Sequence, residues 1–106
     1  MEVKEIHDND GRVLAQAQFA NGKLNGINRV WNTQGLLTEE SSFKDGVRHG
    51  SYTTWWDNGQ KKEEGMFEEG VRVGRYVWHS QKGEIVTEHH YPSMMRMVER
   101  MESDTN

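Results

Sequence analysis

The sequence predicts an all-β protein: an elongated antiparallel β-meander of about 3.5 hairpin repeats, followed by a short α-helix. Three observations lead to this fold class. An aromatic residue recurs every 24 residues, ten of the 11 glycines fall into columns with the same period, and turn-forming pairs separate strand-length runs. A period of about 20 to 50 residues is typical of an array of one supersecondary unit. The aromatic column is Phe19, Phe43, Phe67 and Tyr91, and the glycine columns are Gly22, Gly46 and Gly70, then Gly26, Gly50 and Gly74, then Gly11, Gly35, Gly59 and Gly83.

The repeat divides residues 1–91 into a half-unit and three units, and residues 92–106 form a separate tail. The half-unit spans 1–18, and the units span 19–42, 43–66 and 67–91. Each unit is expected to contain two strands and two turns, which gives about seven or eight strands in all. The low hydrophobicity, with 33% hydrophobic residues and a mean hydropathy of −0.97, favours a thin sheet over a two-layer core.

Two kinds of turn separate the expected strands. The first kind is Asp10-Gly11 and Asn58-Gly59, and the second is Asn21-Gly22, Asp45-Gly46 and Glu69-Gly70. We predict type I′ turns for the first kind, because Asn-Gly and Asp-Gly suit the two positive φ angles of that turn. The glycine column that begins at Gly26 lies within strands, where glycine costs about 0.5–1 kcal/mol relative to alanine. We expect an aromatic ring from a neighbouring strand to pack across each of these glycines.

Period-2 alternation places the aromatic column on one face of the sheet. The residues two positions before the rings share that face and are mostly small: Ala17, Ser41, Gly65 and His89. They leave room for rings from adjacent strands, for which the candidates are Trp31, Tyr52, Trp55, Trp56, Tyr76 and Trp78. The opposite face is expected to carry Glu40, Glu64 and Glu88 in register, roughly 10 Å apart, a spacing at which repulsion is mild.

The tail changes character after Pro92. Four apolar residues recur at helical spacing: Met94, Met97, Val98 and Met101. This spacing predicts a short amphipathic helix over residues 93–102, with Ser93 as its N-cap. The helix either caps the last edge strand or presents its methionine stripe to a partner or a second copy. Disorder is the third alternative.

The central copy has the pattern F-x-x-G-x-x-x-G-x-Y-x-x-W-x-x-N-G-Q-K-x-x-E-x-x-F, from Phe43 to Phe67. This pattern resembles the variant MORN repeat of bacterial proteins, and the similarity extends over about Gly11 to Tyr91. The resemblance implies an elongated, twisted sheet of consecutive hairpins and a binding role without catalysis, and many proteins of this family are described as antitoxin components. The flanking copies depart from the pattern, since Asn28 replaces the tyrosine in one of them.

Composition and motifs argue against several classes of function. A net charge of −4 argues against direct binding of nucleic acid and against an anionic membrane surface. The chain has no cysteine and no apolar segment of membrane-spanning length, so we expect a cytoplasmic protein. His89 and His90 should point to opposite faces of one strand, and we expect no metal site. No nucleophile motif or phosphate-binding loop is present, and we expect neither enzyme activity nor a cofactor.

We therefore expect a non-catalytic protein-binding module: an antitoxin, immunity or inhibitor protein that occludes a basic partner such as a toxin or nuclease. Aromatic anchors dominate interface energetics, and acidic groups steer a basic partner. The candidate partner-binding residues are Tyr52, Trp55, Trp56, Tyr76, Trp78, Glu40, Glu64, Glu88, Met94, Met97 and Met101, with Glu39 and Glu63 on the same acidic rim. Two alternatives stay open. One is a phospholipid-associated scaffold, which the wider MORN family implies, and the other is a self-assembling structural protein, such as a homodimer joined through an edge strand or the C-terminal helix.

Overall fold

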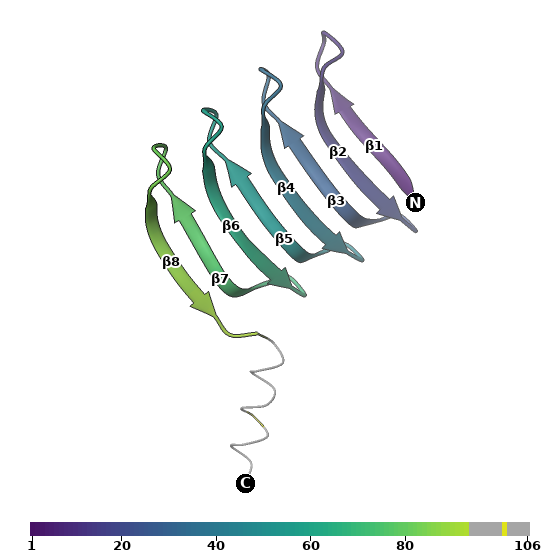
Figure 1. Ribbon diagram of the computed structural model, residues 1–106. Helices are drawn as coiled ribbons and strands as arrows, with labels where there is room; N and C mark the ends of the chain where they lie inside the picture. The colour runs from purple at the N-terminus through teal and green to yellow at the C-terminus, as the bar shows by residue number, and fades with distance from the viewer. Residues whose placement is uncertain (94–100, 102–106) are drawn as a thin grey trace.

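The computed structural model describes residues 1–93 and residue 101. These residues form one sheet of eight antiparallel strands in sequence order, which confirms the predicted all-β meander (Figure 1). The strands are β1 (Glu2–His7), β2 (Val13–Ala20), β3 (Lys23–Trp31), β4 (Leu37–Lys44), β5 (Val47–Trp55), β6 (Lys61–Glu68), β7 (Val71–His79) and β8 (Ile85–Tyr91). The shortest principal extent is 13 Å, as expected for a single layer with side chains on both faces.

Two-residue turns join the strands at one end of the sheet. Asn21 and Gly22 have φ angles of 53° and 78°, which is the geometry of a type I′ turn. The turns at 45–46 and 69–70 repeat this geometry, each with two positive φ angles. In Figure 1 these turns lie at the end of the sheet opposite the longer loops.

The loops at the other end of the sheet are longer. In the first loop, the N–H of Asp8 donates to the carbonyl of Arg12 at 2.9 Å, and the N–H of Gly11 donates to the carbonyl of Asp8 at 3.1 Å. Only the glycine of each such loop has a positive φ, 84° at Gly11, so the prediction of type I′ turns at 10–11 and 58–59 is wrong. A type I turn followed by a left-handed residue has this pattern, and it needs glycine at the left-handed position alone.

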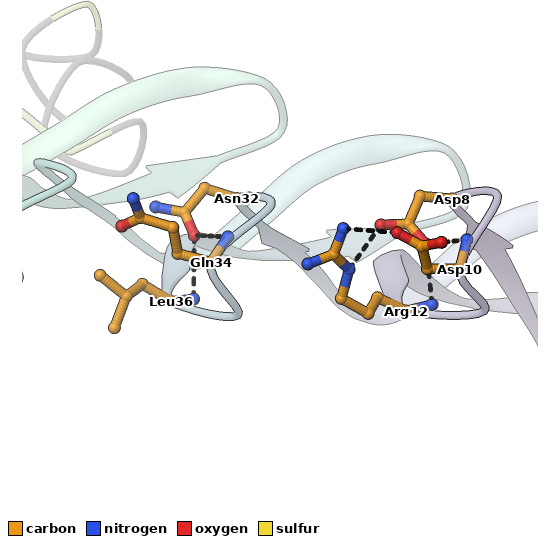
Figure 2. Close-up of polar contacts among 6 residues, drawn as sticks. All are labelled: Asp8, Asp10, Arg12, Asn32, Gln34 and Leu36. Atoms are coloured by element: carbon orange, nitrogen blue, oxygen red, sulfur yellow. Dashed lines mark hydrogen bonds and ion pairs between the residues drawn. The ribbon is translucent and has the colours of Figure 1, made fainter.

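A short polar side chain holds three of these four loops in shape, and Figure 2 shows two of them. Oδ1 of Asp8 accepts hydrogen bonds from the N–H groups of Asp10 and Arg12, both at 2.9 Å. Oδ1 of Asn32 accepts from the N–H groups two and four residues further on, at 2.9 and 3.0 Å, and Oγ of Ser80 does so at 3.2 Å each. The N–H of Arg12 contributes most to holding the pKa of Asp8 below its usual value. The remaining loop has a tryptophan at this position.

Two of the glycines within strands are needed for their backbone conformation. Gly26 and Gly50 have φ angles of 99° and 109°, near points where the pairing register of β3 with β2 and of β5 with β4 shifts. The nearest side chains are Gln18 and Ser42, so the prediction that aromatic rings lie across these glycines is wrong. A left-handed bulge residue favours glycine whatever packs beside it.

The buried core is small, and most of it lies on β7. The buried residues are Ser41, Thr54, Val73, Tyr76 and Val77. Tyr76 is 0% exposed, and its ring covers Gly65, where an added Cβ would lie 2.8 Å from the ring carbon Cγ. This is the one strand glycine at which the expected ring packing occurs.

Residues 94–100 and 102–106 lie outside the described part of the chain. The C-terminal helix therefore stays a prediction.

Candidate functional site

One face of the sheet carries a group of contacting aromatic rings, and we call it the aromatic face. Ring centroids are 5.4 Å apart for Tyr52 and Phe67, 4.5 Å for Tyr76 and Trp78, and 6.1 Å for Tyr76 and Tyr91. These distances are typical of favourable aromatic pairs. The structure thus brings together Tyr52, Tyr76 and Trp78, three of the predicted partner-binding residues.

Two arginines stack on the aromatic face, and the sequence analysis did not identify them. Cζ of Arg48 lies 4.8 Å from the ring centroid of Tyr52, and Cζ of Arg72 lies 4.8 Å from that of Tyr76. Such cation–π contacts are worth about 0.5–1 kcal/mol at exposed sites and more when desolvated. The two arginines are 24 residues apart, so their repeat spacing was a signal that could have revealed them.

Glu39 and Glu63 lie on the aromatic face, close to its loop end. Both pair with Thr54, Glu39 from β4 and Glu63 from β6. Glu63 accepts hydrogen bonds from the hydroxyls of Thr54 at 3.0 Å and Tyr76 at 3.4 Å, and Glu39 accepts one from Ser41 at 3.5 Å. Neither carboxylate forms an ion pair with any residue that the structure describes. Burial, and then the charge of Glu63, raises the pKa of Tyr76 to about 12.

The predicted glutamate column lies on the opposite face, but its carboxylates are not free. The ion pairs are Arg29 Nε with Glu40 Oε2 at 2.8 Å, Lys61 Nζ with Glu64 Oε1 at 3.7 Å, and Arg75 Nε with Glu88 Oε1 at 2.7 Å. Oε2 of Glu64 also lies 3.0 Å from Nε2 of His79, within hydrogen-bonding distance. Arg75, and then His90, lower the pKa of Glu88 by hydrogen bonding to it. The charges on this face are therefore balanced, and the face attracts a basic partner less strongly than the sequence suggested.

Trp55 and Trp56 do not join the aromatic face, so the expectation that their rings fill space on that face is wrong. Alternation along β5 turns Trp55 to the face opposite Thr54. Trp56 begins the loop after β5, and its indole Nε1–H donates to the carbonyl of His79 at 3.1 Å. The two tryptophans instead line a separate hollow of about 500 Å³ at the loop end.

The other predicted features are only partly described. Met94 and Met97 lie outside the described residues, and Met101 is 67% exposed. In the described part of the chain, no group of three or more metal-binding side chains could hold an ion. Nor is any helix there long and apolar enough to cross a membrane.

No protein-family model matches the sequence, and no curated protein is significantly similar to it. The resemblance to the variant MORN repeat therefore depends on the residue pattern alone.

Proposed function

We propose that the protein is a non-catalytic binding module that occludes a basic partner protein, in the manner of an antitoxin, immunity or inhibitor protein. The observation that carries this proposal is the state of Glu39 and Glu63. Both carboxylates are half-buried, and within the described chain they have hydroxyl partners but no ion pair. A carboxylate removed from water is ordinarily neutralised by a cation, so a lysine or arginine of a partner fits here.

The neighbouring rings suit the same interface. Tyr52 and Trp78 are half-buried within the ring cluster, so each keeps some surface that a partner can cover. Tyr76 is fully buried, and it supports the other rings without contacting a partner itself. Aromatic anchors beside charged groups are typical of interface hot spots.

The extended shape provides the area that such an interface needs. The accessible surface is 7316 Å², whereas a compact protein of this mass exposes about 6,100 Å². A standard interface buries about 800 Å² on each partner. One face of the sheet is therefore a sufficient docking surface.

The test compares two pairs of substitutions that remove the same charge from opposite faces. Glu39→Gln with Glu63→Gln removes the carboxylates that form no ion pair with the described residues, and Glu40→Gln with Glu88→Gln is the matched control. A basic protein captured from lysate of the source organism is then purified, and its affinity for each variant is measured by calorimetry. We expect the first pair to weaken binding by about 10- to 100-fold and the control by less than about threefold. Equal losses in the two pairs, or no captured protein, would contradict the proposal.

Self-assembly is the second candidate function, because β1 and β8 are unpaired edges of the described sheet. Ile6 on β1 is 65% exposed and Ile85 on β8 is 53% exposed. Open edges of this kind can pair with a strand of another chain. Sedimentation velocity over a wide concentration range tests this role, and a monomer at every concentration would exclude it.

A further inference from the structure

One residue breaks the repeat at the position that the other units use to hold their loops. The equivalent residues are Asp8, Asn32, Trp56 and Ser80. The backbone of the third loop follows the others, with the N–H of Trp56 donating to the carbonyl of Gln60 at 2.8 Å. An indole has no oxygen, however, and cannot accept the two N–H bonds that Figure 2 shows for the first two loops. In the third loop Oδ1 of Asn58 accepts the N–H of Gln60 at 3.0 Å, so one of the two bonds has moved to another residue and the other is given up. Positions at which a protein gives up a local stabilising device are often functional sites.

The indole of Trp56 is held in one orientation. Its Nε1–H donates to the carbonyl of His79 at 3.1 Å, and Nζ of Lys62 lies 4.7 Å from its ring centroid. The ring is therefore fixed against the next repeat and does not extend freely into solvent.

Side chains also tie this loop to the loops on both sides. Nδ2 of Asn32 donates to Oδ1 of Asp57 at 3.2 Å, and Nδ2 of Asn58 donates to the carbonyl of Gln81 at 2.7 Å. These two bonds connect three successive loops. Binding at a site that is already ordered loses little conformational entropy.

The hollow beside Trp56 combines apolar walls with a polar rim of balanced charge. It measures about 500 Å³ and is lined by Trp55, Trp56, Asp57, Asn58, Lys62 and Gln81. This volume is within the usual range for small-ligand sites. In the described chain, Lys62 forms no ion pair, and Oδ2 of Asp57 has no hydrogen-bond partner. The rim therefore offers both a donor and an acceptor, and its two opposite charges cancel.

We propose that this hollow binds a carbohydrate, with a pyranose ring stacked against an indole. A pyranose is uncharged, has an apolar C–H face, and carries hydroxyl groups that both donate and accept hydrogen bonds. Those properties match two indoles, an ammonium, a carboxylate and the amide of Gln81. A singly charged ligand would be attracted by one of Asp57 and Lys62 and repelled by the other, so the rim gives it no net electrostatic advantage over an uncharged ligand. Neither Glu39 nor Glu63 lines this hollow, so this activity goes beyond the proposed protein binding.

The first experiment titrates the full chain with cellohexaose, chitohexaose and maltohexaose, followed by calorimetry and by NMR of the tryptophan Nε1–H groups. We expect at least one hexaose to bind saturably with a Kd below about 10 mM. It should shift the Nε1–H signals of Trp55 and Trp56 and leave that of Trp31 unchanged. Co-sedimentation with insoluble cellulose, chitin and starch then distinguishes a polymer ligand from a soluble oligosaccharide. No saturable response to any hexaose would overturn the proposal.

The second experiment uses Trp56→Asn, which recreates the loop that Asn32 forms in the preceding unit. This variant should fold with an unchanged or higher Tm, because the side-chain amide oxygen can accept the N–H of Asn58, while the N–H of Gln60 already has an acceptor in Oδ1 of Asn58. We expect it to lose at least about tenfold in affinity, whereas Trp31→Phe should bind normally. Gln81→Ala changes an exposed side chain and should weaken binding with the fold intact. Full affinity in folded Trp56→Asn or in Gln81→Ala would refute the assignment.

Discussion

Replacing Gly65 with alanine tests whether ring packing across a small residue holds the centre of this sheet. Gly65 is the only glycine without a positive φ, so its backbone has no need of glycine. In a strand with space for the new Cβ, this change would stabilise the folded protein by about 0.5–1 kcal/mol. Here the new Cβ would overlap the ring of Tyr76, which is 0% exposed. Overpacking costs about 1–3 kcal/mol, so we expect a net loss of about 0.5–2 kcal/mol.

The N-terminal part of the sheet suggests a matched control. There, Ala17 pairs with Asn28, whereas in the later units the equivalent small residue lies beside a tyrosine. In a Tyr76→Asn background, Gly65→Ala should become neutral or stabilising, because the clashing ring is gone. Tyr76→Asn alone should cost about 3–5 kcal/mol. Urea unfolding followed by tryptophan fluorescence and circular dichroism gives the four free energies of the cycle. Stabilisation by Gly65→Ala in the wild-type chain, or the same effect in both backgrounds, would refute the packing argument.

Three further predictions concern strain and pH. Gly50→Ala should destabilise by about 1–3 kcal/mol, because alanine disfavours a φ of 109° and its Cβ would lie 3.1 Å from Cβ of Ser42; an unchanged urea midpoint would contradict this. The pKa of Tyr76 is about 12 in the folded protein. The protonated phenol therefore contributes about 1–2 kcal/mol to the free energy of unfolding. This contribution is complete below the unfolded-state pKa of about 10 and is lost as the pH rises toward 12. Melting curves at alkaline pH should show this loss, and Tyr76→Phe should reduce it. Arg75 lowers the pKa of Glu88. The contribution of Glu88 to folding stability is therefore present above its unfolded-state pKa and is lost as the pH falls through its folded-state pKa. NMR titration of the Glu88 carboxyl checks the direction of this pKa shift.

The architecture could be read from the sequence because its causes are local and recur. The glycine of each long loop and the pair Asn21-Gly22 occupy backbone conformations that few other residues tolerate, and they return every 24 residues. A run of such positions leaves a meander of hairpins as the simplest connection. The reason for Gly50 was misread, because a β-bulge shifts register without any mark in the polarity pattern.

Which side chains on each face are available to a partner depends on contacts between strands, and period-2 alternation does not specify those contacts. Glu39 and Glu40 are neighbours of one type in sequence, and period-2 alternation places them on opposite faces, so the prediction of one acidic rim that bears both is wrong. Only the folded sheet places Arg29 at 2.8 Å from Glu40 and leaves Glu39 unpaired in the described chain, because long side chains choose their partners across strands. In the same way, neither Trp55 nor Trp56 joins the ring cluster. Trp55 lies on the opposite face of the sheet, and Trp56 begins the loop after β5. The sequence alone determined that the chain has aromatic and acidic side chains that could bind a partner. Tertiary packing determined which of these side chains already contact other residues of the chain.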